Sequence, residues 1–485
     1  MLDLIYSNCY NGSTKVVRRE LFVEKTVCEL FAGVGGFRCG LNNIKESVVY
    51  SPENNAKEKW QTVWYNQWEP AEKSTQYAHD CYKYHFGVCL DKNGNDTTNI
   101  DIEKVDKTTI PDFSLLVGGF PCQDYSVASS LATSKGLEGK KGVLWWSIRK
   151  MIEVKQPPFV LLENVDRLLK SPASQRGRDF GIMLACFRDE GYTVEWRVIN
   201  AAEYGYQQRR RRTFIFAYKN TTKYAQHISD TIGYNSEDND SKSAIAKLLG
   251  TEGFFASTFA IKAIQESKIK TTSLSENIGD ISDSFQFGFE NCGVMKDGLI
   301  YTIKTTPNYS GKQITLGDVM ETGDVDESYF IPEEQLYYTN PEINRSDESQ
   351  GKLPIQQRKT WQYLKGAKKL LRKSSNGHEY IYSEGPIAMI DEEDKPARTM
   401  LTSEGSFSRS THIVRDRKTG RIRLLTAEEA ERIQGFPTEH TKYCDVNGEV
   451  VEMPLRKRRF MMGNALVVNL ISDMEKTLSS IIDAE

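Results

Sequence analysis

A cysteine lies in a turn whose composition could make its thiol reactive. Residues 118–123 (GGFPCQ) follow the apolar run 113–117 (FSLLV), which is short, bounded and β-prone and therefore predicts a buried strand. The glycines allow a sharp turn, and Pro121 stiffens it. Cys122 is thus predicted on a loop past the carboxyl end of a strand, where open α/β sheets bind ligands. As a thiolate it would be a nucleophile, whereas Pro-Cys alone is more typical of a small buried hydrophobe.

An acid and a group of arginines follow at other predicted strand ends. The run 159–162 (FVLL) predicts a buried strand that ends at Glu163. Its carboxylate could act as a general acid, although an isolated glutamate more often caps a helix or forms a salt bridge. The arginines at 209–212 lead directly into a predicted strand at 213–218 (TFIFAY). Some of them can point inward to carboxylates and others outward to phosphate. A solvated charge run is the alternative, and arginine alone makes it less expected.

Two segments could hold an adenosine-bearing ligand. A predicted strand at 26–31 (TVCELF) feeds the glycine-rich turn 32–40 (AGVGGFRCG), as in the opening of a doubly wound nucleotide-binding fold. Arg38 stands where a dinucleotide fingerprint has its third glycine, so we do not expect a pyrophosphate cradle. A second predicted strand at 62–65 ends in 66–70 (NQWEP), where the tryptophan could stack on a base and polar groups could bind a ribose. A plain tight turn and a half-buried tryptophan are the alternatives.

A sheet and its helices must position these side chains. Elsewhere in residues 26–218, hydrophobic periodicity predicts an amphipathic helix at 71–86, a helix at 143–154 and a strand at 191–199. The segment 99–102 (NIDI) could carry a further ligand carboxylate at a strand end, and the Ser/Gly-rich segment 124–141 could form a lid. Strands that alternate with helices predict an α/β fold with a largely parallel sheet.

The character of the chain changes near Lys219. From there to about Ser383 the strand–helix alternation ends, apart from strand-like pieces such as 299–303. A basic, aromatic-bearing segment at 358–373 could face phosphate or be the solvated face of a helix. Regular structure then returns, with a helix that begins after the N-cap Thr426 and stops at Gly435, and with an apolar closing helix.

Composition limits the class of protein. With 485 residues, 39% hydrophobic and 27% charged, the chain is expected to fold as two or more domains of a soluble globular protein. No apolar run approaches membrane-spanning length, and the start has no signal-peptide pattern. Nine cysteines form no regular C-x-x-C framework, so we predict reduced thiols and no metal site. A net charge of -3 means that any nucleic-acid surface must be a local patch.

Taken in order, these pieces resemble the DNA cytosine-5 methyltransferase family. The resemblance rests on the segments 29–36 (ELFAGVGG), 119–123 (GFPCQ), 163–165 (ENV), 208–212 (QRRRR), 432–437 (RIQGFP) and 463–465 (GNA). It implies a Rossmann-like, class I S-adenosylmethionine-dependent methyltransferase sheet with a second, smaller target-recognition domain. The implied catalytic domain consists of residues 1–218 and 384–485, and the implied recognition domain of residues 219–383.

The resemblance also implies a mechanism. Cys122 would attack carbon 6 of a cytosine flipped out of the duplex, and Glu163 would protonate or hydrogen-bond the ring nitrogen N3. Carbon 5 would then take the methyl group of S-adenosylmethionine, and loss of the carbon-5 proton would release the thiol. Arg212 would contact the cytosine, and Arg210 would orient the acid and the sugar-phosphate.

The implied cofactor residues come from several segments. By resemblance, the cofactor is held by the methionine-end loop, the adenine-stacking tryptophan, the adenine-edge pair and a late asparagine, namely Phe31, Gly33, Gly35, Gly36, Trp68, Asp101, Ile102 and Asn464. One position departs from the family pattern, because Gln67 replaces the ribose-binding acid expected before the tryptophan. Gln67 or Glu69 must therefore hold the ribose hydroxyls, unless that contact is weak. Arg211 also stands where many members have an acid, which we interpret as tolerated variation.

Three other functions were weighed. Intact Cys122, Glu163 and Arg212 argue against an inactive, purely DNA-binding relative, and Arg38 argues against a nicotinamide-dependent oxidoreductase. An RNA cytosine methyltransferase would share the core, but the large segment 219–383 favours duplex DNA, because reading base edges needs a dedicated surface. We therefore expect a monomeric enzyme of the bacterial cytoplasm that binds double-stranded DNA and S-adenosylmethionine, not membranes. Its expected setting is a restriction–modification system with a cognate restriction endonuclease.

Overall fold

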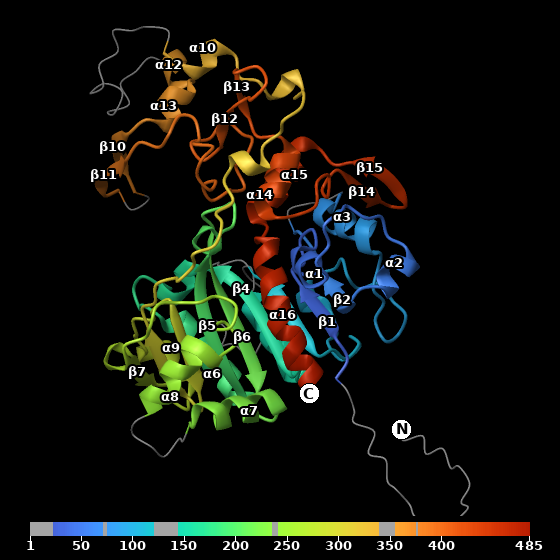
Figure 1. The fold of residues 1–485 in the computed structure, drawn as a ribbon, viewed down its shortest axis with the longest axis vertical. Helices are drawn as coiled ribbons and strands as arrows, with labels where there is room; N and C mark the ends of the chain where they lie inside the picture. The colour runs from blue at the N-terminus through green and yellow to red at the C-terminus, as the bar shows by residue number, and fades with distance from the viewer. Residues whose placement is uncertain (1–22, 71–74, 121–143, 235–240, 339–354, 375–376) are drawn as a thin grey trace, which may run out of the picture.

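A mixed nine-stranded sheet forms the centre of the molecule (Figure 1). The computed structural model describes residues 23–70, 75–120, 144–234, 241–338, 355–374 and 377–485. The strands lie in the order β2-β1-β3-β4-β6-β5-β8-β9-β7. Some neighbours in this order, such as β1 and β3 or β4 and β6, are not consecutive in the chain, so crossover connections help to build the sheet, as expected for a doubly wound α/β fold.

One half of the sheet is parallel. It contains β2 (Gln61–Asn66), β1 (Thr26–Leu30), β3 (Leu115–Gly119) and β4 (Phe159–Val165). The four strands predicted from the sequence in these places are confirmed, with small shifts at their ends. Because parallel strands all end at one edge, the polar segments that follow them meet there.

The other half is antiparallel. β6 (Arg211–Lys219) lies between β4 and β5 (Tyr192–Asn200), which confirms both predicted strands. The sheet continues through β8 (Cys292–Lys296), β9 (Leu299–Ile303) and β7 (Lys270–Ser273). The arginine segment therefore enters the sheet next to the strand that ends at Glu163.

The chain after Lys219 has more regular structure than the sequence predicted. Besides β7, β8 and β9 it forms α7 (Lys223–Ile232), α8 (Ser241–Lys247) and α9 (Ile278–Ser284). These strands are short. β7 has the sequence KTTS with mostly exposed side chains, so no hydrophobic periodicity predicted this strand. Because β8 pairs with β5, the domain boundary predicted after residue 218 does not coincide with an edge of the sheet.

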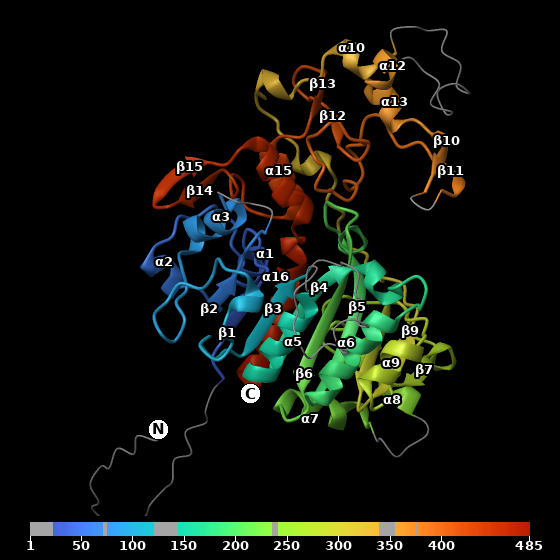
Figure 2. The ribbon, with the colours of Figure 1, turned by 180° about the vertical axis from the view of Figure 1, so that it is seen from behind.

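Helices cover both faces of the sheet, and successive strand residues point alternately towards one helical layer and the other. Leu115 and Val117 pack in one core with α1 (Gly36–Leu41), α3 (Tyr77–Phe86) and the closing helix α16 (Val468–Ala484). Leu116 packs in the other core, with α5 (Leu144–Lys155) and α6 (Arg178–Asp189). Figures 1 and 2 show α16 on one face and α5 on the opposite face. The C-terminal segment thus completes one of the two helical layers that cover the sheet.

A smaller unit lies beyond the carboxyl edge of the parallel strands (Figure 1). It contains α10 (Glu333–Leu336), α12 (Ile355–Arg358), α13 (Trp361–Lys365), β10 (Lys368–Lys373), β11 (Glu379–Glu384), β12 (Ile413–Arg415) and β13 (Ile422–Leu424). Its core joins Trp361 to Ile413 and Ile422. The boundary predicted after residue 383 therefore falls inside this unit, because the segment that follows it returns to pack on Trp361.

The predicted helices are found with changes in extent. The helix expected at 71–86 is described over Tyr77–Phe86, and the basic segment 358–373 is divided between α12, α13 and β10 instead of one helix. The predicted N-cap is confirmed, because Thr426 and Glu429 form a capping box at α14 (Ala427–Gln434), which stops at Gly435. α15 (Leu455–Asn464) precedes the closing helix. The remaining helices and strands of the described residues are α2 (Pro52–Ala56), β14 (Tyr443–Val446) and β15 (Glu449–Glu452). Among the helices of the described ranges, none has the length and apolar character that a bilayer crossing requires.

The contact between α1 and α16 gives a test of this layer arrangement. A Cβ atom on Gly40 would lie 2.4 Å from Cβ of Ile471, so Gly40→Ala should lower the free energy of unfolding by about 1–3 kcal/mol through overpacking. Urea denaturation of both proteins measures this difference. Gly250→Ala is the matched control, because its new Cβ would meet only Ile264, at 3.7 Å. Equal losses in the two variants would contradict the close helix contact.

Candidate active site

An acid and an arginine face each other where β4 and β6 run antiparallel. Nε of Arg212 lies 2.8 Å from Oε1 of Glu163, and both side chains are largely buried, with 15% and 12% of their surfaces exposed. The register pairs Val165 with Arg212, so the arginine reaches back along the strand to the carboxylate. The remaining exposure faces the edge where ligands bind in such sheets. The sequence left open whether Glu163 is a general acid or forms a helix cap or a salt bridge. The structure shows that it forms a salt bridge with Arg212. Because this pair lies at the ligand-binding edge and is partly exposed, a substrate can still reach it.

The chain that leads to the predicted nucleophile is anchored beside this pair. Nδ2 of the buried Asn164 donates a hydrogen bond of 2.9 Å to the carbonyl of Phe120. Gly119 pairs with Glu163 in the sheet, and a Cβ atom on Gly119 would lie 3.3 Å from Oε2 of that carboxylate. The glycine therefore leaves room for the acid. Cys122 and the predicted lid at 124–141 lie outside the described residues.

Arg210 is buried and forms hydrogen bonds with three backbone carbonyls. Its guanidinium donates to the carbonyls of Met400 (2.9 Å), Gly463 (3.1 Å) and Asn464 (3.3 Å). Burial lowers its pKa from the ordinary value, the positive charge of Arg212 lowers it further, and Glu163 opposes the shift. The resemblance implied that Arg210 orients the acid and the sugar-phosphate. The described contacts instead place its donors on the backbone of the returning segment.

The glutamines before the arginines bind the same returning segment. Oε1 of Gln208 accepts from the amide of Met400 at 3.2 Å, and its Nε2 donates to the carbonyl of Ile433 at 3.3 Å. Thr399 donates its hydroxyl proton to the carbonyl of Arg209 at 2.5 Å. Residues 397–400 are therefore part of the site, although no sequence motif indicated them. Their composition carries no signal of its own, and only the long-range contacts reveal them.

The glycine-rich turn is fixed by the segment after β2. The amide of Gly33 donates a 2.8 Å hydrogen bond to Oε1 of Gln67, whose side chain is buried, and Nε2 of Gln67 lies 3.5 Å from Glu69. Gln67 is thus already engaged with the turn, which leaves Glu69 as the more accessible of the two predicted ribose ligands. Trp68 is 37% exposed at this edge, so part of its surface is available for contact with a ligand.

The three predicted cofactor glycines differ in what surrounds them. Gly33 has a φ of 58°, and no atom of the described residues lies within 4 Å of the Cβ position, so this side of the turn is open to a ligand. A Cβ on Gly35 would lie 2.6 Å from the Phe86 ring, and one on Gly36 would lie 3.2 Å from Leu466. Gly35 and Gly36 therefore allow close packing. Phe31 adopts a φ of 55°, an unusual conformation for a non-glycine residue that often marks a functional turn.

The other predicted cofactor residues lie along the same edge or close to it. Nδ2 of Asn66 donates to the carbonyl of Ile100 at 2.9 Å, which ties the loop before Asp101 to the end of β2. Asp101 caps a short 3-10 helix at Ile102–Lys104, so the strand expected before it is replaced by a loop. Asn464 ends α15 with an exposed side chain, and its carbonyl bonds Arg210. Ile102 is buried.

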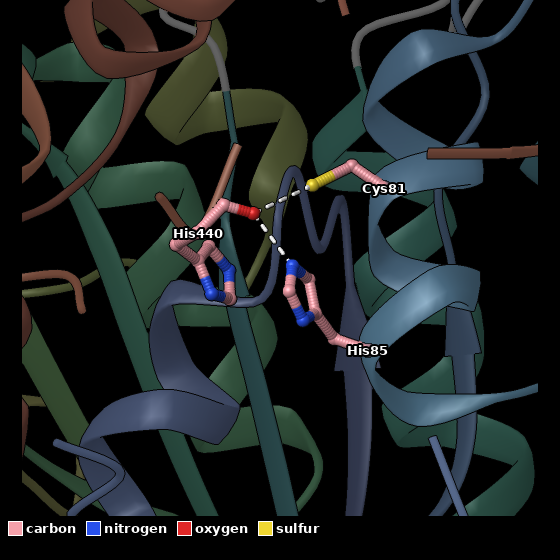
Figure 3. A group of neighbouring side chains, drawn as sticks. All are labelled: Cys81, His85 and His440. Carbon is pink, nitrogen blue, oxygen red and sulfur yellow. Dashed lines mark hydrogen bonds between the residues drawn. The ribbon is translucent and has the colours of Figure 1, made fainter. Parts of the chain in front are cut away.

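A buried group of Cys81, His85 and His440 lies behind the glycine-rich turn (Figure 3). These residue types could ligate a metal, but the two imidazoles are stacked at 4.2 Å with an angle of 8°, and ring lone pairs in parallel planes do not converge on one ion. Nε2 of His85 and Sγ of Cys81 both contact the backbone oxygen of His440, at 2.5 and 3.5 Å. Nε2 of His440 bonds the carbonyl of Val34 at 2.7 Å, and burial lowers the pKa of both histidines. The geometry favours a hydrogen-bonded support for the turn.

The fold and the site together define a class of protein. A doubly wound sheet places an open glycine turn and a half-exposed tryptophan at one end of its carboxyl edge, and an acid–arginine pair at the centre. This arrangement is typical of a transferase that binds an adenosine-bearing cofactor beside a polar substrate.

Comparison with known proteins identifies the family. The family model for C-5 cytosine-specific DNA methylases matches residues 25–480. The chain is 42% identical over 456 residues to the Type II methyltransferase M.Sau3AI of Staphylococcus aureus, across 94% of this chain and 95% of that protein. It is 29% identical over 192 residues to the Type II methyltransferase M.HhaI of Haemophilus parahaemolyticus, across 40% of this chain and 48% of that protein. The chain therefore belongs to the C-5 cytosine-specific DNA methylase family, and its enzyme class is DNA (cytosine-5-)-methyltransferase.

A solved structure is similar at lower identity. The mutant DNMT2 of Spodoptera frugiperda matches with a TM-score of 0.48 and 12% sequence identity, across 95% of this chain and 99% of that chain. For this chain, the family implies S-adenosylmethionine as the methyl donor. The open side of Gly33 and the half-exposed Trp68 fit a cofactor with an adenosyl group.

A buried carboxylate lies in β1, just before the glycine-rich turn. Glu29 in β1 is 1% exposed, and Tyr82 donates a hydrogen bond of 2.9 Å to its Oε2. Its Oε1 has no hydrogen-bond partner within the described part of the chain. Burial raises the pKa of Glu29 to about 7, against the opposing effects of Tyr82 and Arg38. The folded protein therefore keeps a proton that the unfolded chain releases between about pH 4 and pH 7.

This proton uptake predicts a pH-dependent effect of Glu29→Gln. Because the folded-state pKa is raised, wild-type stability falls as the pH rises towards about 7, and the amide removes that loss. The stability of the variant relative to the wild type should therefore increase by about 2–3 kcal/mol between pH 5 and pH 8. Urea denaturation at both pH values measures it, with the exposed Glu46→Gln as control. A difference that does not change with pH would contradict the buried, protonated state.

Proposed function

We propose that this enzyme methylates carbon 5 of a cytosine flipped out of a specific double-stranded DNA sequence, through a covalent adduct with Cys122. The observation that carries the proposal is the Glu163–Arg212 pair beside the anchored carbonyl of Phe120. Cys122 follows Phe120 by two residues, so this anchor limits how far the thiol can lie from the acid. The Type II relatives support a role in a restriction–modification system.

Each residue of the site then has one task. The thiolate of Cys122 adds to carbon 6 of the cytosine, and Glu163 hydrogen-bonds or protonates N3, so the negative charge is delocalised as an enamine. Arg212 holds Glu163 in place and presents its remaining donors to the base. Carbon 5 becomes nucleophilic and takes the methyl group. Loss of the carbon-5 proton and elimination of the thiolate restore the aromatic ring and the free enzyme.

The cofactor is proposed to lie along the glycine turn. S-adenosylmethionine supplies an electrophilic methyl group when bound. Trp68 stacks on its adenine, Glu69 binds the ribose, and the open side of Gly33 accepts the methionine end. Phe31, Asp101, Ile102 and Asn464 complete the pocket in this proposal. Gln67, Gly35 and Gly36 contribute by fixing the turn through their contacts with Gly33, Phe86 and Leu466.

Target recognition is proposed for the smaller unit around Trp361. This unit lies beyond the edge that carries Glu163, so DNA bound between the two parts would meet both surfaces. Within this proposal the enzyme acts as a monomer in the bacterial cytoplasm, and a cognate restriction endonuclease cleaves the unmethylated site. Arg210 acts indirectly in this scheme, because it positions the segment at 397–400 beside Arg212.

Replacement of the proposed nucleophile gives the direct test. Cys122→Ser should abolish methyl transfer while DNA and S-adenosylmethionine still bind, because the hydroxyl is a far poorer nucleophile than a thiolate. Bisulfite sequencing of plasmid DNA from cells that express each protein reads the activity. Cytosines protected in one short context by the wild type only would support the proposal. Cys89→Ser, a partly buried cysteine elsewhere, should retain activity. Normal turnover by Cys122→Ser would remove Cys122 from this role.

The stacking role of Trp68 predicts a selective change in cofactor affinity. Trp68→Ala should raise the Michaelis constant for S-adenosylmethionine by about tenfold or more, whereas that for DNA should change little, because one aromatic stack is worth about 1–3 kcal/mol. Steady-state kinetics with each substrate varied in turn separates the two constants. Tyr337→Ala removes an aromatic side chain of similar exposure away from the turn and serves as control for the cofactor constant alone, because it lies in the unit proposed to bind DNA. Unchanged cofactor affinity in Trp68→Ala would disprove the stacking contact.

A further inference from the structure

A two-stranded hairpin projects from the smaller unit and exposes one face completely. β10 and β11 pair antiparallel, with Leu371 opposite Ile381. The members of this face are Lys369, Leu371, Lys373, Glu379, Ile381 and Ser383, all of them exposed. Leu371 is 70% exposed and Ile381 62%, so a cross-strand apolar pair stands in solvent at the centre of the face. Two such side chains together contribute nothing to a core, and exposed apolar pairs of this kind mark binding surfaces.

The opposite face of the hairpin has the structural role. Leu370 and Tyr382 are partly buried there, and the guanidinium of Arg372 stacks over the Tyr382 ring at 3.6 Å. An isolated hairpin is marginally stable in water, so these contacts help to keep the strands paired. The face with Leu371 and Ile381 is therefore free to meet a partner without loss of these contacts.

The hairpin is held at a fixed position relative to the active site. Arg409 donates to the carbonyls of Leu364 and Gly366, at 3.0 and 2.6 Å, and also to that of Gly385. Gly366 and Gly385 flank the two strands, so Arg409 clamps the base of the hairpin. The segment that carries Arg409 begins at residues 397–400, which Gln208, Arg209 and Arg210 bind. One continuous segment thus connects the hairpin with the acid–arginine site.

A second hairpin provides an internal comparison. β14 and β15 also form an isolated pair with an exposed apolar residue, Val450, at 60% exposure. Their charged residues Asp445, Glu449 and Glu452 are acidic, whereas β10 reads KKLLRK. In Figures 1 and 2 the two hairpins lie at opposite sides of the molecule. Only β10–β11 joins exposed apolar side chains to positive charge.

We propose that the Leu371–Ile381 face enters the major groove of the DNA substrate and contacts the C5 methyl group of thymine in the recognised sequence. This inference rests on the proposed function and adds the residues that read the bases. The major groove admits a two-stranded ribbon, and the thymine methyl is the apolar group that its base edges display. Lys369 and Lys373, on the same face, contact the phosphates on either side of the groove. Lys373 already has an exposed partner, Glu379 at 3.4 Å, which it would exchange for phosphate.

Thymine analogues test the apolar contact. The wild-type enzyme is assayed on duplexes in which deoxyuridine replaces each thymine of the methylated site in turn, a change that deletes only the methyl group. We expect at least one replacement to lower kcat/KM about fourfold, the effect of one buried methyl group. In the double variant Leu371→Ser, Ile381→Ser the same replacement should have no effect, and discrimination against duplexes altered at that base pair should fall about tenfold.

Controls separate this inference from the function on which it rests. Val450→Ser should keep the wild-type response to deoxyuridine, and circular dichroism melting should confirm that all variants are folded. Wild-type protein that methylates no cytosine would contradict the proposed function itself. Methylation with a recognised site that contains no thymine, or a double variant that responds to deoxyuridine like the wild type, would overturn the hairpin assignment while leaving the enzyme activity established.

The lysines give an independent measurement. Lys369→Gln, Lys373→Gln should weaken binding to cognate and non-cognate duplexes by the same factor, because phosphate contacts carry no base information. The slope of log Kd against log salt concentration should decrease by about two, close to one counterion per lysine. Lys476→Gln, an exposed lysine on α16 that is paired with Asp473, is the matched control outside the smaller unit and should leave the slope unchanged. An unchanged slope in the hairpin variant would place this face away from DNA.

Discussion

The hydrogen bonds of the buried Arg210 guanidinium are the constraint on which the site depends. Burying a cation costs several kcal/mol unless its donors are satisfied, and here backbone carbonyls of Met400, Gly463 and Asn464 accept from its two terminal nitrogens, while Nε has no partner in the described part of the chain. These carbonyls belong to segments that lie far from Arg210 in the sequence. The same strand end presents Arg212 to Glu163, so the arrangement that fixes the returning segment also fixes the acid. Arg210 and Arg212, two residues apart, therefore fix the returning segment and the Glu163 carboxylate respectively.

The parallel half of the sheet explains why the remaining functional groups converge. The turn after β1, the Gln67–Trp68 segment after β2 and the Gly119–Phe120 segment after β3 leave the same edge, and hydrogen bonds then connect neighbours. Gly35 and Gly36 allow α1 to approach Phe86 and Leu466, and His440 fixes Val34 from the returning chain. The glycine-rich turn and its surroundings thus require both the first and the last parts of the sequence.

The smaller unit has a core of its own, and residues 397–411 connect it with the arginine segment that enters the central sheet. Thr399 binds the backbone of Arg209, and Arg409 binds the base of the β10–β11 hairpin. A surface that reads DNA must hold its side chains at a fixed distance from the reacting base, because small misplacements are costly in catalysis. A single segment bonded at both ends provides such a connection without a large interface.

Local sequence determined the features that depend on near neighbours. The strands of the catalytic sheet, the Thr426–Glu429 capping box and the halt at Gly435 follow from hydrophobic period and helix-cap chemistry, and the motifs predicted the family that the comparisons confirmed. Tertiary structure alone decided the rest. The polar strand β7 is held by pairing with β9, β8 enters the sheet by pairing with β5, and Gln67 is occupied by the Gly33 amide. Residues 397–400 enter the site through bonds to a segment almost two hundred positions away, which no local pattern encodes. Sequence motifs predicted which groups could react, and long-range hydrogen bonds decided which of the described ones meet, because their energy depends on positions that only the folded chain brings together.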